Sequence, residues 1–273
     1  MEKIGIFYIA TSIYKEYFNM YFLPSMKNLF PDDKKELIIL SDGLEEYNNK
    51  FIDNFNIHVE NIINFPYPII NLVKFQLIEY YAKKYNINII LYFDADTIIF
   101  NKSNYFWENL KHKIINSDNL ICSYHPHYLY NKLFDFTKNI FFPFNEFDSK
   151  SLKIDYYKLR NNKNYIMTSF FMGKYEYIKL YSEKIYDYAK IGLANTFIRC
   201  IPWFSDETYL NIINQKEGNK IIMDNYITIN PYTLYSDKYK DKNINNIWEN
   251  NFPEYENIII NQKFDIELKN KIR

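Results

Sequence analysis

Short apolar runs, each ending at a polar residue, most strongly constrain how this chain can fold. Runs of this length are too short for buried helices and are typical of strands that are covered on both faces, as in a parallel sheet. The first half of the chain contains three of them and a fourth, more polar candidate at Ile57 to Ile63. The three runs are Ile4 to Ala10, Leu37 to Leu40 and Ile87 to Phe93.

Segments with helical periodicity separate these runs. Tyr14 to Met26 carries apolar residues at helical spacing, and Pro24 is expected to distort or end that helix. The alternation of strands and helices predicts an α/β fold of Rossmann-like type, with a mixed, mostly parallel central sheet. The remaining expected elements are helices at Ile69 to Tyr85, Lys174 to Ala194 and Asp206 to Asn214, and strands at Leu120 to Tyr124, Tyr165 to Met172 and near Ile221.

Composition limits the classes of protein to which the chain can belong. Its 273 residues are 48% hydrophobic and 24% charged, the balance of a folded protein and not of a disordered one. With no repeat or linker, we expect one domain over 1–273, with a nucleotide-binding first half at 1–100, a second part at 101–235 and a tail at 236–273. The formal net charge is zero, which argues against nucleic acid as a partner.

Cysteine usage and hydropathy favour a cytoplasmic location. Only Cys122 and Cys200 are present, too few for a disulfide framework and compatible with a reducing compartment. The first residues do not resemble a secretory signal, and no apolar run approaches the length that spans a bilayer. Peripheral contact with the inner membrane stays open.

The most informative stretch is Asp94-Ala95-Asp96, which lies between two strongly apolar runs. Buried carboxylates need a counter-ion or an open cleft, and ligands of α/β sheets bind beyond the carboxyl ends of strands. Carboxylate oxygens suit Mn²⁺ or Mg²⁺, which could bridge Asp94 and Asp96 to a diphosphate. The alternative is structural, with one aspartate capping a turn and the other facing water.

Two classes of enzyme carry an Asp-x-Asp after such a strand. One is the nucleotide-sugar transferases of the GT-A fold. The other is the haloacid-dehalogenase-like phosphatases, whose Asp-x-Asp-x-Thr pattern is also met by Asp94 to Thr97. In those phosphatases the motif lies on the first strand, whereas here an α/β pattern precedes it. The phosphatase is therefore the weaker alternative.

A second group of acids follows Trp203, in the segment from Phe204 to Asn211. Read alone, this segment could simply start a helix, with Ser205 as the N-cap and with Asp206 and Glu207 in the first turn, where acids are favoured. It could equally present two carboxylates to a ligand. The residues by themselves leave both interpretations open.

The segment resembles the Trp-His-Asp-Glu-Ser-His-Leu-Asn motif of glycosyltransferase family six, which includes the blood-group A and B transferases and α1,3-galactosyltransferase. Other family segments have counterparts in the same order between about residues 4 and 235. Asp94 and Asp96 match its metal-binding pair. The other counterparts are Ile9-Ala10-Thr11 through Tyr14 for uridine, Pro68 to Phe75 with Lys74 replacing an arginine, His125-Pro126 for the acceptor, and Met167 to Gly173 for donor selection.

The resemblance implies a retaining hexosyltransferase that moves galactose or N-acetylgalactosamine from a UDP-sugar to an oligosaccharide or lipid-linked glycan, with an α1,3 linkage. Mn²⁺ on Asp94 and Asp96 would hold the diphosphate, with Lys74 adding positive charge. Glu207 would act at the anomeric carbon, Asp206 would bind donor hydroxyls, and His125 and Trp203 would contact sugar. Residues 101–235 would then be mainly the half that binds the acceptor and the donor sugar. A non-catalytic carbohydrate-binding domain is the other alternative, which three intact acids disfavour.

The matched segments also depart from the family pattern. Phe204 replaces the tryptophan of the motif, Ser205 and Tyr209 replace its histidines, and Lys74 loses the planar fork of arginine. Met167 and Ser169 match the positions around the 2-substituent of the donor sugar. The bulk of Met167 favours galactose over N-acetylgalactosamine.

Overall fold

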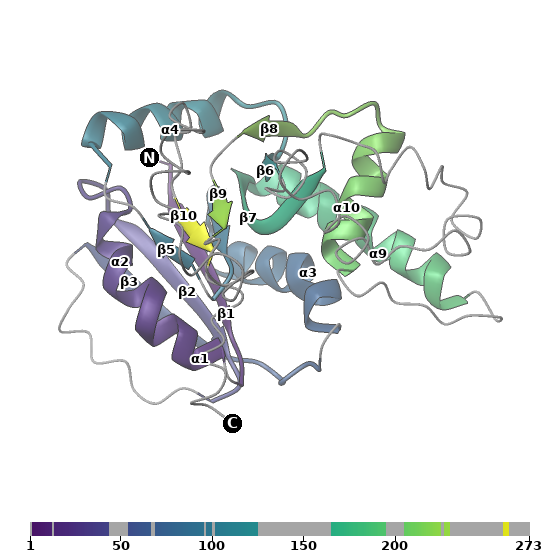
Figure 1. Cartoon of the computed structure of the whole chain (residues 1–273), viewed down its shortest axis with the longest axis horizontal. Coiled ribbons are helices and arrows are strands. Elements are labelled where there is room, and N and C mark those ends of the chain that lie inside the picture. The colour runs from purple at the N-terminus through teal and green to yellow at the C-terminus, as the bar shows by residue number, and fades with distance from the viewer. Residues whose placement is uncertain are drawn as a thin grey trace, which may run out of the picture.

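A seven-stranded mixed sheet forms the centre of the protein in the computed structural model (Figure 1). The structure describes residues 2–12, 14–43, 54–66, 69–95, 97–99, 102–124, 165–194, 205–224, 227–229 and 259–261. Six of the seven strands run in the same direction, and β7 alone is antiparallel to both of its neighbours. In spatial order the strands are β3 (Phe55–Asn61), β2 (Lys35–Ser41), β1 (Ile4–Ala10), β4 (Ile89–Phe93), β7 (Ile166–Lys174), β6 (Ile121–Tyr124) and β8 (Ile222–Asp224).

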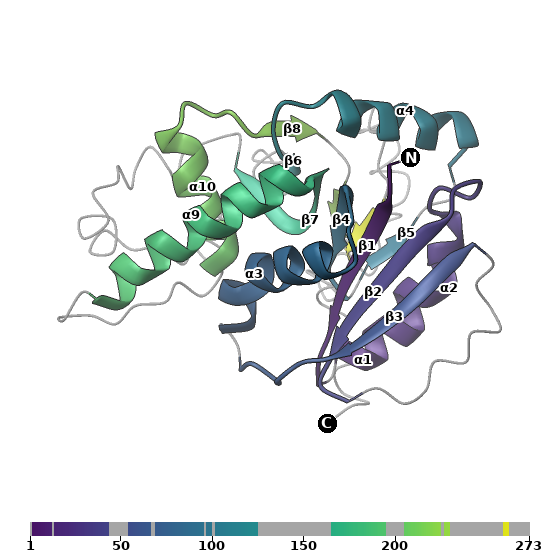
Figure 2. The ribbon, with the colours of Figure 1, turned by 180° about the vertical axis from the view of Figure 1, so that it is seen from behind.

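Helices cover both faces of this sheet, so the fold is a three-layer α/β arrangement with a Rossmann-like first half. Figure 1 shows the face with α1 and α2, and Figure 2, seen from behind, shows α3 and α9 on the other. The first face carries α1 (Tyr14–Tyr17), a π-helical turn (Phe18–Phe22), α2 (Leu23–Ser25), a 3₁₀ turn (Met26–Asn28) and α4 (Asn104–Asn116). The second face carries α3 (Ile69–Lys84), α9 (Tyr175–Ala194) and α10 (Ser205–Lys216).

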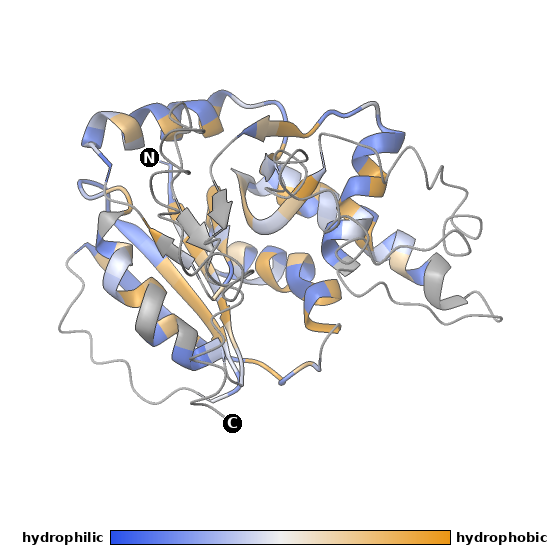
Figure 3. Ribbon diagram, in the orientation of Figure 1, coloured by the Kyte–Doolittle hydropathy of each residue, from blue (hydrophilic) through white to orange (hydrophobic). Residues whose placement is uncertain are grey.

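Every residue of β1 is buried because the strand is covered on both sides. Its side chains alternate between two apolar cores, as the pleat requires. Ile6 and Tyr8 belong to the core beneath α1 and α4, whereas Phe7 and Ile9 belong to the core beneath α3 and α9. Figure 3 shows the resulting pattern, in which apolar stretches on the strands contrast with helices that also carry polar residues.

The expected elements match the observed ones to within about two residues at their ends, a normal margin. The strand expected from Ile4 to Ala10 has those limits in the structure. Pro24 does distort its helix: the π-helical turn at Phe18–Phe22 directly precedes α2, in which Pro24 is an early residue. A proline cannot donate the usual helical hydrogen bond, so the turn before it rearranges.

Two features were not expected from the sequence. Helix α4 begins after Ser103, whose side chain accepts a hydrogen bond from the Phe106 amide at 3.3 Å. A small second sheet joins β5 (Thr97–Ile99) to β10 (Ile259–Asn261) and β10 to β9 (Ile227–Ile229).

Within the described ranges, no helix combines the length and the apolar character needed to cross a bilayer.

Candidate active site

The strand order reverses direction between β1 and β4, at the carboxyl ends of these two strands. Strand β1 lies between β2 and β4, and the chain continues from β1 toward β2 and β3 before returning to β4 on the other side. Such a reversal of strand order is the usual ligand position in open α/β sheets. Thr11 follows β1 at this edge and Asp94 follows β4.

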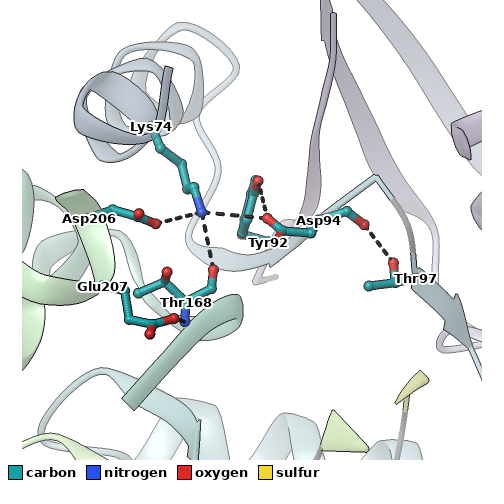
Figure 4. Close-up of polar contacts among 7 residues, drawn as sticks. All are labelled: Lys74, Tyr92, Asp94, Thr97, Thr168, Asp206 and Glu207. Carbon is teal, nitrogen blue, oxygen red and sulfur yellow. Dashed lines mark hydrogen bonds and ion pairs between the residues drawn. The ribbon is translucent and has the colours of Figure 1, made fainter. Parts of the chain in front are cut away.

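Lys74 on α3 lies at the centre of a buried charge cluster in this region (Figure 4). Its Nζ is 2.6 Å from Oδ2 of Asp206 and 3.5 Å from Oδ1 of Asp94, and it donates to the Thr168 carbonyl at 3.3 Å. The side chains of Lys74 and Asp206 are 5% and 2% exposed, whereas that of Asp94 is 18% exposed. Asp94 is therefore the acid of this cluster that a ligand reaches most easily.

Tyr92 contacts two members of this cluster, Asp94 and Lys74. Its hydroxyl donates to Oδ1 of Asp94 at 2.8 Å, and the Lys74 ammonium lies 4.7 Å from the centre of its ring. Burial raises the pKa of Tyr92 well above its ordinary value, and the charge of Asp94 raises it further, so the phenol stays protonated. The ring of Tyr92 stacks on Phe171, which stacks on Phe75, so Tyr92 is part of a stack of three aromatic rings.

Helix α10 delivers Asp206 and Glu207 to the same place from a distant part of the sequence. Both lie in its first turn, where the helix dipole favours negative charge, and both are buried. Oε2 of Glu207 accepts a hydrogen bond from the Thr168 amide at 3.4 Å. Asp206 is thus held by Lys74 and Glu207 by the backbone of β7.

The side chain of Asn211 fastens α10 to β7. Its Oδ1 accepts from the Ile166 amide at 2.8 Å, and its Nδ2 donates to the carbonyls of Ile166 at 3.0 Å and Glu207 at 2.8 Å. The side-chain amide therefore bonds both the N–H and the C=O of Ile166, as the backbone of a neighbouring strand would. This contact fixes the position of Glu207 relative to the strand that holds it.

An irregularity in β7 provides the backbone groups that the site uses. Cys122 of β6 pairs with Phe171, but the next residue of β6 pairs with Met167, so residues 168–170 are passed over. Met167 and Phe170 consequently face the same core, although regular alternation would separate them. The backbone of Thr168, one of the residues passed over, contacts Glu207 and Lys74. The Ser169 carbonyl accepts from the Asp94 amide at 2.9 Å, which continues the ladder between β4 and β7 beyond the Phe93–Phe170 pair.

The cluster brings together three carboxylates and one ammonium group, an excess of negative charge. Such a site suits a cationic ligand or a reaction that develops positive charge. Hard carboxylate oxygens are the ligands that Mn²⁺ and Mg²⁺ prefer, and Asp94 offers one at the carboxyl end of β4. The described residues include no group of three or more His, Cys, Asp or Glu that could hold a metal, and Asp96 lies outside them. Metal binding stays a prediction.

No protein-family model matches the chain, and no curated protein is significantly similar to it.

The structure brings together four of the residues proposed from the sequence: Lys74, Asp94, Asp206 and Glu207. The segment that we expected to bind uridine, Ile9 to Thr11, is buried at the carboxyl end of β1, and Tyr14 is 45% exposed. Met167 and Ser169 are both buried on β7. Three further candidates lie outside the described residues: Asp96, His125 and Trp203.

Sequence reasoning missed three contributors: Tyr92, Thr168 and Asn211. Two of them leave a signal in the sequence. Tyr92 is two residues before Asp94, hence on the same face of β4, and Asn211 is four residues after Glu207, hence on the same face of α10. Thr168 contributes backbone groups that depend on the irregularity in β7, and its side chain gives no sign of this.

Proposed function

We propose that this protein is a retaining glycosyltransferase that moves galactose or N-acetylgalactosamine from a UDP-sugar to an acceptor glycan. The acceptor is an oligosaccharide or lipid-linked glycan, the new linkage is α1,3, and the reaction takes place in the cytoplasm. The mixed α/β sheet is compatible with the GT-A type of fold that the resemblance to family six implies.

One observation carries the proposal. The two segments that resemble the family most closely, at Asp94 and at Asp206-Glu207, are far apart in sequence, yet both contact Lys74 or the β7 backbone beside it. Two unrelated structural features, a strand end and a helix start, have no need to converge on one buried lysine. A shared ligand site accounts for the convergence.

The nucleotide would bind beyond the carboxyl ends of β1 and β4, where the strand order reverses. Ile9, Ala10 and Thr11 end β1 there, and Tyr14 presents a partly exposed ring on which a base can stack. Asp94 and Asp96 would hold a divalent ion, which, when bound, stabilises negative charge on the departing diphosphate. Lys74 adds a fixed positive charge on the same side.

Asp206 and Glu207 would face the donor sugar. Asp206 pairs with Nζ of Lys74 at 2.6 Å, whereas Oε2 of Glu207 accepts a longer hydrogen bond from the Thr168 amide at 3.4 Å, so we assign the role at the anomeric carbon to Glu207. It would act either as a nucleophile or as electrostatic support for an oxocarbenium-like transition state. Asp206, oriented by Lys74, would accept hydrogen bonds from donor hydroxyls.

The preference between donors rests on Met167 and Ser169. Both side chains are buried, and Met167 packs in the same core as Phe170. On size alone, methionine at this position favours UDP-galactose. Differences of this kind are worth about 1–3 kcal/mol.

The test is hydrolysis and transfer of UDP-galactose and UDP-N-acetylgalactosamine, with Mn²⁺ or with EDTA, by the wild type and by Asp94→Asn. The asparagine keeps an oxygen for the Tyr92 hydroxyl but loses the charge that a cation needs. We expect release of UDP that EDTA abolishes, and about a hundredfold or greater loss in the variant. Asp187→Asn, which changes an exposed carboxylate on α9, is the matched control and should behave as wild type.

Each alternative function gives a different result. Phosphate release from monoesters without UDP-sugar turnover would support the phosphatase. Sugar binding with neither activity would support a carbohydrate-binding domain. Turnover that EDTA and Asp94→Asn leave unchanged would overturn the metal assignment and leave the transferase in place.

A further inference from the structure

The loop after β1 contains a residue in an unusual backbone conformation. Ser12 has a φ of 53°, in the left-handed region that residues other than glycine rarely adopt. The two hydrogen bonds that start the next helix depend on it: the Tyr14 amide donates to the Thr11 carbonyl at 3.0 Å and the Lys15 amide to the Ser12 carbonyl at 3.2 Å. The backbone at Ser12 therefore decides where Tyr14 lies.

Asp42, at the end of the neighbouring strand β2, holds this conformation in place. The Ser12 amide is 3.1 Å from each of its two carboxylate oxygens. Lys15 closes the arrangement, with its Nζ 3.1 Å from Oδ1 of Asp42 and 3.2 Å from the Gly43 carbonyl. The strand ends are adjacent because Ala10 and Ser41 are partners in the sheet.

The contacts of Asp42 are directed at the loop. The Asp42 carboxylate accepts a hydrogen bond from the Ser12 amide and pairs with the Lys15 ammonium, so both of these contacts are made to the loop after β1. A polar side chain that holds a strained residue of a different segment is a common way to preorganise a binding loop. Strain at a non-glycine residue persists only where neighbouring groups enforce it.

We propose that Asp42 is a positioning residue for nucleotide binding: it holds Ser12 in the left-handed conformation, so that Tyr14 presents its ring to the base of a uridine nucleotide. This inference rests on the proposed function, since the nucleotide is the donor's. Asp42 acts through Ser12 and does not itself touch the nucleotide.

A pair of substitutions distinguishes positioning from direct contact. Asp42→Ala removes the acceptor that holds Ser12, whereas Ser12→Gly lets the backbone adopt a positive φ without help. If Asp42 only positions the loop, the double variant should recover most of the binding that Asp42→Ala loses. If Asp42 bound the nucleotide directly, glycine at position 12 could not replace that contact.

The experiment is calorimetric titration of UDP with Mn²⁺ into the full chain. We expect Asp42→Ala to raise the Kd about tenfold, which corresponds to ~1.4 kcal/mol, and Asp42→Ala/Ser12→Gly to return it to within about threefold of wild type. Asp42→Asn keeps an oxygen for the amide and should bind nearly as wild type. Asp33→Ala, which breaks an Asp–Lys pair with Lys111 elsewhere on the surface, is the control and should leave the Kd unchanged.

The outcomes separate this inference from the proposed function. A wild type that does not bind UDP refutes the proposed function, and the nucleotide role of the loop with it. If the wild type binds UDP and Asp42→Ala binds equally well, or if Ser12→Gly fails to restore the double variant, the positioning role is wrong and the transferase proposal stands. Thermal unfolding of all variants checks that each is folded at the temperature of the titration.

Discussion

At the scale of single residues, the positive charge of Lys74 offsets the repulsion among three acids that lie close together in the candidate site. An unpaired buried charge is costly, and breaking a buried pair by removing one partner costs about 3–5 kcal/mol. Lys74 pairs with Asp206 at 2.6 Å and with Asp94 at 3.5 Å, whereas Glu207 accepts a hydrogen bond from the backbone amide of Thr168. The roles of the acids therefore differ, although all three are carboxylates.

This difference leads to a prediction for Glu207. Glu207→Gln keeps the shape of the side chain and removes the charge that would act at the anomeric carbon. We expect kcat for UDP-sugar turnover to fall by at least about a hundredfold, with UDP affinity within about threefold of wild type, because the lost interaction belongs to the transition state. Steady-state kinetics and UDP titration measure the two quantities.

Glu217→Gln is the matched control, since Glu217 follows the same helix and pairs with Lys184 on the surface. Its kinetics should equal those of wild type. Near-normal turnover in Glu207→Gln would instead assign Glu207 a structural role at the start of α10.

At the scale of elements, the site depends on how α10 is attached to β7. The Asn211 amide makes three hydrogen bonds to the backbone and is 1% exposed. Because α10 carries both Asp206 and Glu207, a small shift of the helix displaces two acids at once. Misplacement by about 1 Å can cost catalysis about a hundredfold.

Asn211→Ala should therefore reduce stability and turnover together. Leaving buried backbone groups without partners costs about 1–3 kcal/mol each, so we expect the free energy of unfolding to fall by about 3 kcal/mol. We expect kcat to fall at least tenfold, measured well below the unfolding midpoint. Urea denaturation and steady-state kinetics give the two values.

Asn214→Ala separates the two effects. Asn214 is also buried on α10, but its Oδ1 accepts from the Ile221 amide, away from the acids. This variant should lose stability while its kcat stays near that of wild type. Equal losses of kcat in both variants would show that Asn211 acts only through general stability.

Sequence patterns predicted the elements well and the contacts between them less well. Strand β1 and helix α3 follow from apolar periodicity, because local pattern and burial agree there. Four site residues followed from motifs. The irregularity in β7 and the pairing of Lys74 with Asp206 depend on segments far apart in sequence, and no local pattern encodes such contacts.

At the scale of the whole molecule, stability should depend on acids outside the candidate site. Burial alone would raise the pKa of Glu36 and of Glu60, but hydrogen bonds from His58 and Lys3 to Glu36, and from Lys84 and Tyr85 to Glu60, outweigh it. Both pKa values therefore lie below the ordinary value. These contacts join β2, β3 and α3 at one edge of the sheet.

A folded-state pKa below that of the unfolded chain has a defined consequence. On acidification the unfolded chain takes up these protons first, so the stabilisation is complete above the ordinary glutamate pKa and is lost as the pH falls through the folded values. We expect the free energy of unfolding, from urea titrations, to decrease between about pH 5 and pH 3. Glu60→Gln should weaken that decrease, whereas Glu176→Gln, a change at an exposed residue of α9, should leave it unchanged.

The small sheet has a consequence for the order in which the chain folds. Strand β5 directly follows the segment of Asp94, yet its partner β10 is the last of the described elements to be synthesised. Loop closure over such a separation is entropically costly and slow, so this pairing should form after the large sheet. During translation, β5 therefore lacks its strand partner until almost all of the described chain has left the ribosome. A nascent or prematurely terminated chain could complete its main sheet and still lack this contact beside the candidate site.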